Sequence, residues 1–250
     1  MRTTGMRVFV DVGAHYGETL RIALNPKWGF DRIHVLEPAG ACQSTLNRFR
    51  DPRVTVHPIA LADRNGVAEF HGAGLLGGSL LAEKRQIADA GEIFSEAVRL
   101  RRASEWFSEQ LPIGAEIYIK MNCEGGEVAI LDDLLASGLI VQVKSMYVDF
   151  DIRKVAGQEW QQERLESDLH AKGVRFISRL EGQGSTAAIE RWLADDCAPR
   201  KSSFMSDLVY RLGFHLPPYE QATTILSILL PRRVYWWIGH RFGRLRRSRH

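Results

Sequence analysis

Short apolar runs alternate with longer amphipathic segments along most of this chain, and this alternation is the feature that most limits its possible folds. Short apolar runs are typical of buried strands, whereas apolar residues spaced three and four apart are typical of helices. A regular succession of the two predicts parallel strands joined by helices that cover both faces of one sheet. We therefore expect an α/β fold with a doubly wound, Rossmann-like, mostly parallel sheet.

The expected elements can be placed by residue number. Strands are predicted at 6–12, 32–36, 54–60, 67–71, 98–101, 116–121, 143–150, 174–178 and 206–210, with 67–71 as a short partner of 54–60. Helices are predicted from the first turn to residue 24, and at 41–49, 104–110, 127–137, 158–172 and 187–195, and a polar helical stretch is expected after the glycine-rich segment 72–78. We expect a sheet domain over residues 1–216 and a helical, basic C-terminal extension over 217–250.

The first predicted strand runs directly into a glycine-containing turn, in the sequence VFVDVGAHYGETL. Such a turn lets a ligand approach the backbone, and the N-terminus of the following helix faces that ligand. The dinucleotide pattern G-x-G-x-x-G fails because His15 and Glu18 stand where it needs glycines, and no P-loop lysine follows. Asp11 would repel a pyrophosphate, so Asp11, Gly13, His15 and Gly17 favour a ligand that carries a cationic amino acid. A plain turn with a surface Asp11 is the alternative.

Glu37 ends the second predicted strand, where an acid can accept both ribose hydroxyls of an adenosine. Pro38 fixes the turn that follows it. Alternatively, Glu37 caps the next helix. The third strand leads to Ala62 and Asp63, and we expect Asp63 to reach the adenine amino group, although Asp63 to Gly66 also has the composition of a good turn.

Four blocks of sequence within residues 8–151 resemble the FkbM family of class I methyltransferases: VFVDVGAHYGETL, IHVLEP, HPIALADRNGVAEF and IYIKMNCEGGEVAIL. In the last block, Lys120, Glu124, Gly125 and Glu127 match the family pattern, whereas Asn122 stands where the family usually has aspartate. The resemblance implies the class I methyltransferase fold, a seven-stranded sheet with an antiparallel last strand. It also implies S-adenosyl-L-methionine as the cofactor, bound across the ends of the first two strands, and O-methyl transfer to hydroxyls of sugars, glycolipids or polyketides.

Methyl transfer to an alcohol needs a base that takes the hydroxyl proton as the new bond forms. Asn122 and Glu124 are expected near the transferring methyl, and Asn122 can orient the acceptor but cannot be the base. Asp149 and Asp151 alternate on the predicted strand 143–150 and its end, so they can share one face and raise one pKa. His71 is a third candidate base. Salt bridges from the two aspartates to Arg153 or Lys154 and a solvated His71 are the alternatives.

Lys120 is expected either to pair with a buried acid or to contact the acceptor, and Glu127 to cap the helix that starts there. The loop 71–81 is expected to form a lid or a wall on the acceptor side, or a simple connection. The expected function is an S-adenosylmethionine-dependent O-methyltransferase for a sugar, glycolipid or related metabolite. A cofactor-binding but catalytically weak protein is the alternative that Asn122 suggests, and the failed G-x-G-x-x-G pattern argues against an oxidoreductase.

The basic charge of the chain is concentrated at its end. Seven arginines and no acidic residue follow Glu220, so the rest of the chain carries a net charge of −4 although the whole carries +3. Apolar residues follow helical spacing between Val234 and Leu245 and include Trp237. This pattern predicts peripheral contact of residues 231–250 with an anionic membrane, and the alternative is packing on the domain or on a second subunit of a homodimer. A nucleic-acid partner is less favoured because the body is slightly acidic.

The remaining composition suggests a cytoplasmic protein, peripheral at the inner face of the cell membrane if the tail binds there. No secretory signal is expected at the N-terminus, and no apolar stretch is long enough to cross a bilayer. Cys42, Cys123 and Cys197 are odd in number and show no CxxC spacing, so neither a disulfide framework nor a zinc cluster is expected. The eight histidines form no ligand-spaced set either, and no metal site is expected.

Overall fold

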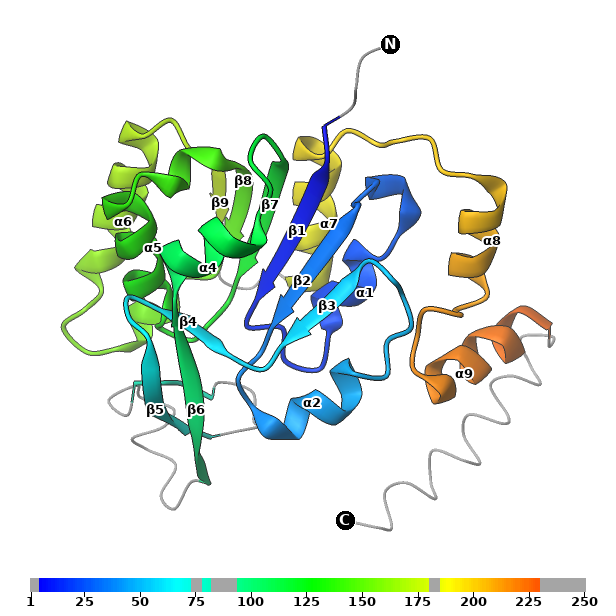
Figure 1. Cartoon of the computed structure of the whole chain (residues 1–250), viewed down its shortest axis with the longest axis horizontal. Helices are drawn as coiled ribbons and strands as arrows, with labels where there is room; N and C mark the ends of the chain where they lie inside the picture. Colours follow the sequence, from blue (N-terminus) through cyan, green and yellow to red (C-terminus); the bar gives the residue numbers. More distant parts are fainter. Residues whose placement is uncertain (1–4, 73–77, 82–93, 180–184, 230–250) are drawn as a thin grey trace.

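A computed structural model of the chain describes residues 5–72, 78–81, 94–179 and 185–229. Its centre is a six-stranded sheet in the order β3-β2-β1-β7-β8-β9, and every neighbouring pair is parallel (Figure 1). The strands are β1 (Arg7–Val12), β2 (Arg32–Leu36), β3 (Val54–His57), β7 (Glu116–Met121), β8 (Val143–Val148) and β9 (Phe176–Ser178). The strand order reverses between β1 and β7, which is where ligands bind in open sheets of this kind. The expected doubly wound α/β fold is confirmed.

Helices cover both faces of this sheet (Figure 1). One face packs against α1 (Glu18–Ala23), α2 (Gly40–Leu46) and α7 (Ser185–Asp196). The other packs against α4 (Ala103–Gln110), α5 (Glu127–Ala136) and α6 (Trp160–Ala171). Short 3-10 turns complete the connections as η1 (Pro26–Trp28), η2 (Leu139–Gln142) and η3 (Asp151–Lys154).

The alternation of side chains along β1 supplies both cores. Val8, Val10 and Val12 face the side of α4 and α5, whereas Phe9 faces the side of α1 and α7. All six residues of β1 are buried, as expected for a central parallel strand that is covered on both faces. Burial of each such apolar side chain contributes about 1.5–3 kcal/mol. Arg7 and Asp11 are the charged residues of this strand, and Asp11 lies on the α1 side next to Lys120 of β7.

A second, three-stranded sheet corrects two sequence-based expectations. The predicted strand 54–60 is divided into β3 and β4 (Ala60–Ala62), because Pro58 has no N–H for the ladder and the chain turns tightly between His57 and Ile59. β4 pairs with β6 (Ser95–Arg102), and β5 (Gly66–His71) pairs antiparallel with the other edge of β6. The prediction that 67–71 pairs with the third strand is therefore wrong.

The predicted strand 206–210 is also wrong, because these residues lie in helix α8 (Phe204–Arg211). The Ser203 side chain accepts a hydrogen bond from the Ser206 N–H and caps this helix. The central sheet therefore has six strands among the described residues, and no antiparallel seventh strand is seen there.

Helix α9 (Pro218–Leu229) follows α8 and contacts the sheet domain through an ion pair between Glu220 and Arg21 of α1. Within the described parts of the chain, none of the helices combines the length and apolar character that crossing a bilayer requires. The predicted amphipathic stretch 234–245, residues 82–93 of the stretch expected to be helical after residue 78, and residues 73–77 of the predicted lid lie outside the described residues.

Candidate functional site

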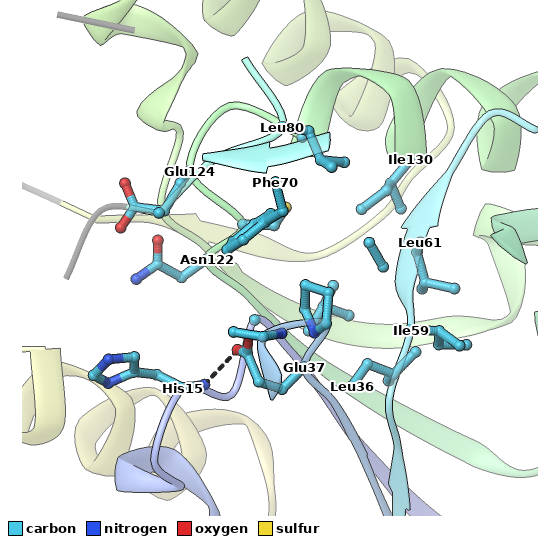
Figure 2. Close-up of a pocket in the computed structure, with 18 residues that line it drawn as sticks. His15, Leu36, Glu37, Ile59, Leu61, Phe70, Leu80, Asn122, Glu124 and Ile130 are labelled. Carbon is cyan, nitrogen blue, oxygen red and sulfur yellow. Dashed lines mark hydrogen bonds between the residues drawn. The ribbon is translucent and has the colours of Figure 1, made fainter. Parts of the chain in front are cut away.

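A pocket lies at the carboxyl ends of β1, β2 and β7, where the strand order reverses (Figure 2). It encloses about 750 Å³, including the part open to solvent. Pockets for small molecules usually measure ~300–1,000 Å³. His15, Asn122 and Glu124 form its polar end, Glu37 lies in the middle, and Leu36, Ile59, Leu61, Leu80 and Ile130 form its apolar end. The pocket therefore suits an elongated ligand with one apolar and one polar end.

The turn after β1 is shaped by Gly13, which lines the pocket. Its φ of 74° is favourable only for glycine, and a Cβ atom there would lie 1.9 Å from the backbone oxygen of Asn122. The Asn122 N–H in turn donates to the Val12 oxygen over 3.0 Å. The ends of β1 and β7 can approach this closely only because residue 13 has no side chain.

Gly17 shapes the same loop without lining the pocket. It is the N-terminal cap of α1 with a φ of 86°, and a Cβ there would lie 3.1 Å from the Phe49 ring. The expected ligand contact of Gly17 is thus indirect, since this residue lets the loop turn into α1.

Glu37 ties the two loops of the pocket together. Its carboxylate accepts the His15 N–H over 2.8 Å and the Ala39 N–H over 2.9 Å, and the side chain is only 6% exposed. Burial raises the pKa of Glu37, while these two backbone N–H groups act in the opposite direction. Ala39 is the N-terminal cap residue of α2 and this helix has no side-chain cap, so Glu37 holds the chain just before the helix and does not cap its first turn. Two accepted bonds still leave lone pairs for ligand hydroxyls, because a carboxylate offers about four acceptor positions.

Asp11 lies beneath the pocket instead of lining it. The carboxylate is fully buried, and one oxygen lies 3.0 Å from the Lys120 ammonium. Burial raises the pKa of Asp11 and the Lys120 charge opposes this shift. Lys120 also donates to the Gly13 oxygen over 2.6 Å. Of the two roles considered for Lys120, the structure therefore supports that of a partner for a buried acid, and the pair holds the first loop against β7.

Two atoms at the polar end of the pocket are buried without a hydrogen-bond partner among the described residues. They are Asn122 Oδ1 and His15 Nε2. His15 Nδ1 lies 3.2 Å from a Glu18 oxygen, and this hydrogen bond raises the pKa of His15. Buried polar atoms without partners are rare in native structures, and a bound ligand is one way to satisfy them.

His15 and Glu124 also have unusual backbone conformations, with φ values of 50° and 57°. Both are non-glycine residues with positive φ, and both line the pocket. Side chains in this region are strained, and such residues cluster at functional sites. This coincidence supports the pocket as the functional site.

The two aspartates after β8 do not form the carboxylate pair that was expected. β8 ends at Val148 and Asp151 begins the turn η3, so the strand alternation does not extend to both residues. Asp149 pairs with Arg153, as its alternative interpretation predicted, and also with Arg179, and it does not line the pocket. Asp151 lies 2.7 Å from the Lys154 ammonium, which also lies 4.0 Å from Glu124.

Three further predicted residues lie outside the pocket, although their neighbours line it. Asp63 is exposed and pairs with Arg64, while Ala62 is buried in β4. His71 lies 3.0 Å from the Ser95 hydroxyl, and it is the preceding Phe70 that contributes to the pocket wall. Pro38, by contrast, lines the pocket as expected for the turn after β2.

Sequence reasoning missed the apolar wall of the pocket. Leu36 could have been identified from its place just before Glu37, and Leu61 from its place just before Ala62. Gly78 and Leu80 of segment 71–81 line the pocket, but Leu80 lies at its apolar end and not beside the candidate base Glu124. Among the residues that the structure describes, no cluster of His, Cys, Asp and Glu has the geometry to hold a metal ion.

Comparison with known proteins gives one distant structural similarity. No family model and no curated protein matches the sequence. The fold is similar to a crystal structure described as methyltransferase FkbM from Methylobacillus flagellatus KT, with 18% sequence identity and a TM-score of 0.43. The match covers 68% of this chain but only 38% of that chain. The similarity therefore spans less than half the length of that protein. The family named there is the one that the sequence motifs resemble.

Proposed function

We propose that this protein is an S-adenosylmethionine-dependent methyltransferase that methylates a hydroxyl group. The observation that carries the proposal is the buried Glu37 carboxylate, held by the N–H groups of His15 and Ala39 midway along a pocket with one apolar and one polar end. The adenine ring suits the apolar end, the ribose hydroxyls suit Glu37, and the charged amino acid portion suits the polar end.

The chemistry of the donor set fits this cofactor. Gly13 leaves room for a ligand at the end of β1, and the buried Asn122 Oδ1 and His15 Nε2 offer polar contacts without present partners among the described residues. Glu37 and Glu124 add negative charge beside a cationic ligand. When bound, S-adenosylmethionine supplies an electrophilic methyl group attached to a positively charged sulfur.

The chain itself has to orient the acceptor and receive its proton. Asn122 can hydrogen-bond the acceptor hydroxyl, and Glu124, which lines the pocket, is the base that we propose. Asp149 is held by Arg153 and Arg179, and His71 does not line the pocket, so both are weaker candidates. A sugar, glycolipid or related metabolite is the acceptor class that we propose, in line with the family that the motifs resemble.

Calorimetry tests the cofactor. We expect S-adenosylmethionine to bind at least tenfold more tightly than NAD, and Glu37→Ala to weaken it about 10- to 100-fold, because hydrogen bonds to a charged group contribute about 1.5–3 kcal/mol. Glu96→Ala is the matched control, since Glu96 accepts the Gly40 N–H at the start of α2 but does not line the pocket. Equal losses in both variants would leave Glu37 with a structural role only and contradict the cofactor site.

A second experiment separates an enzyme from a binding protein with the same fold. Asn122 stands where the FkbM family usually has aspartate, so a protein that binds the cofactor without transferring its methyl group is the alternative. Transfer of a labelled methyl group from S-adenosylmethionine into a cell-envelope extract is expected for the enzyme. Tight cofactor binding without any transfer would favour the binding protein.

A further inference from the structure

The carboxyl group of Glu124 does not stand alone at the polar end of the pocket. The carboxyl group of Asp151, a residue that is 1% exposed, lies near it, and Glu124 contributes to the raised pKa of Asp151. Each of two neighbouring carboxylates disfavours the ionisation of the other, unless they hold a proton between them or a nearby cation compensates their charge. The ammonium group of Lys154 lies 2.7 Å from Asp151 and 4.0 Å from Glu124, so one cation serves both carboxylates.

The two carboxyl groups belong to different loops, and a third buried acid holds those loops together. Glu127 accepts the Gly125 N–H over 2.8 Å and the Ile152 N–H over 2.7 Å. These N–H groups follow Glu124 and Asp151 directly in the sequence. Glu127 therefore holds together the two backbone segments that carry Glu124 and Asp151.

We propose that Glu124 and Asp151 work as one carboxyl pair, in which Asp151 positions Glu124 and shares the proton that Glu124 takes from the acceptor hydroxyl. This inference rests on the proposed function. As the acceptor oxygen gains the methyl group, its hydrogen leaves as a proton to Glu124, while the bonding electrons of the carbon–sulfur bond stay with sulfur, which becomes neutral. The proton then lies between Glu124 and Asp151, with Lys154 beside both.

The charged surroundings of the pair support this division of roles. Burial raises the pKa of Asp151 to about 6, and Glu124 adds to this shift while Lys154 opposes it. The titratable and charged groups that face Asp151 are Cys123, Glu124, Glu127, Arg153, Lys154 and Arg179. Only Glu124 and Cys123 of these also line the pocket, and burial raises the pKa of the Cys123 thiol, which keeps it neutral.

The proton of the pair can be followed without any cofactor. In the full-length protein with ¹³C-labelled carboxyl groups, we expect an NMR titration of Asp151 near pH 6 that moves to lower pH in Glu124→Gln, because Glu124 adds to the raised pKa of Asp151. Asp151→Asn should move the Glu124 titration down by about one pH unit, because an amide can donate to the carboxylate and no longer competes for the proton. Lys154→Met should move the pair's titration up by a similar amount, since a nearby cation is lost. Lys172→Met, at the exposed end of α6, should change neither.

Opposite shifts in the two variants are the result expected for a shared proton. Unchanged titration of Glu124 in both Asp151→Asn and Lys154→Met would overturn the proposal. If Asp151→Asn fails to fold, the shift in Lys154→Met decides the question alone. These titrations stand apart from methyl transfer, so their outcome does not depend on whether the proposed activity is found. Where transfer is measured, the acid limb of the pH profile should move in the same directions, and Glu124→Gln should lower kcat about 100-fold or more.

Discussion

Gly13 and Gly138 have nearly the same backbone angle but very different surroundings. Their φ values are 74° and 73°, yet a Cβ at Gly13 would meet the Asn122 backbone at 1.9 Å, whereas one at Gly138 would meet no atom within 4 Å. An alanine at either position bears the strain of a positive φ, which amounts to about 1–3 kcal/mol. Only at Gly13 does a clash with a neighbouring backbone add to this strain.

We therefore expect Gly13→Ala to lower the free energy of unfolding by at least about 2 kcal/mol more than Gly138→Ala, because strands β1 and β7 must separate to admit the methyl group. Urea denaturation of both variants measures the difference. The Gly13 variant should also lose affinity for S-adenosylmethionine. Equal destabilisation of the two variants would show that the ends of β1 and β7 are not as close as described.

The buried Glu127 makes the stability of the folded protein depend on pH, and the direction of this dependence follows from its raised pKa. Burial raises its pKa from 4.5 to about 7, so the folded protein holds this proton more tightly than the unfolded chain does. The corresponding stabilisation is complete below pH 4.5 and is lost as the pH rises through about 7, a change of about 3 kcal/mol. Asp151 acts in the same direction, because its pKa is raised to about 6.

A glutamine at position 127 stays neutral at every pH. The free energy of unfolding of the Glu127→Gln variant should therefore fall less between pH 4.5 and pH 7 than that of the unaltered protein. Chemical denaturation at several pH values measures this slope. Glu109→Gln is the control, because Glu109 is largely exposed and pairs with Arg101 at the surface. A Glu127 variant that keeps the full slope would contradict the raised pKa.

At the scale of single residues, the sequence predicted those site residues whose role depends on local backbone. Gly13, His15, Glu37 and Pro38 lie in turns directly after strands, and all four line the pocket. Asp63 was misplaced because its position depends on how β4 pairs, and this pairing is with the distant strand β6. The contact between Glu124 and Asp151 was not predictable either, because it joins two loops whose separation is set by the sheet.

At the scale of elements, β1 and β7 are joined by the buried pair of Asp11 and Lys120. The register places these residues directly opposite one another, and both side chains are less than a tenth exposed. Removing one member of a buried ion pair leaves an uncompensated charge, at a cost of about 3–5 kcal/mol, whereas replacing both by apolar residues is often neutral.

Lys120→Met is therefore expected to destabilise the protein by about 3–5 kcal/mol, and the double variant Asp11→Leu with Lys120→Met by clearly less. A double-mutant cycle of unfolding free energies measures the coupling. The double variant should still lose the lysine contact to the Gly13 oxygen, so cofactor affinity should remain low even where stability returns. Additive effects of the two substitutions would contradict the ion pair.

The sequence located helices and strands well wherever the apolar pattern was regular. β2 was predicted with its observed bounds, and so was β7. The errors arose where tertiary context decides. Pro58 breaks a run that is apolar on both sides, and the apolar residues of 206–210 fit a helix as well as a strand until the Ser203 cap is considered.

At the scale of the whole molecule, apolar surface and basic charge both lie toward the C-terminus. Phe204 and Met205 of α8 are 78% and 61% exposed, and Phe214 and Tyr219 are also exposed nearby in the chain. The seven arginines follow α9 in the sequence. We propose that this end of the protein binds an anionic lipid surface, which would bring a lipid-linked acceptor to the pocket.

Vesicle sedimentation tests this proposal with matched charge variants. The expected result is binding to vesicles that contain phosphatidylserine, little binding to phosphatidylcholine vesicles, and weakening as salt screens the charges. Each arginine near the surface contributes about 1 kcal/mol, so replacing Arg244, Arg246 and Arg247 by glutamine should weaken binding about 100-fold. Replacing the exposed Arg32, Arg48 and Arg99 of the sheet domain removes the same charge and should have little effect. Equal weakening by both triple variants would mean that net charge alone attracts the protein to the membrane, and the C-terminal surface would then have no specific part in binding.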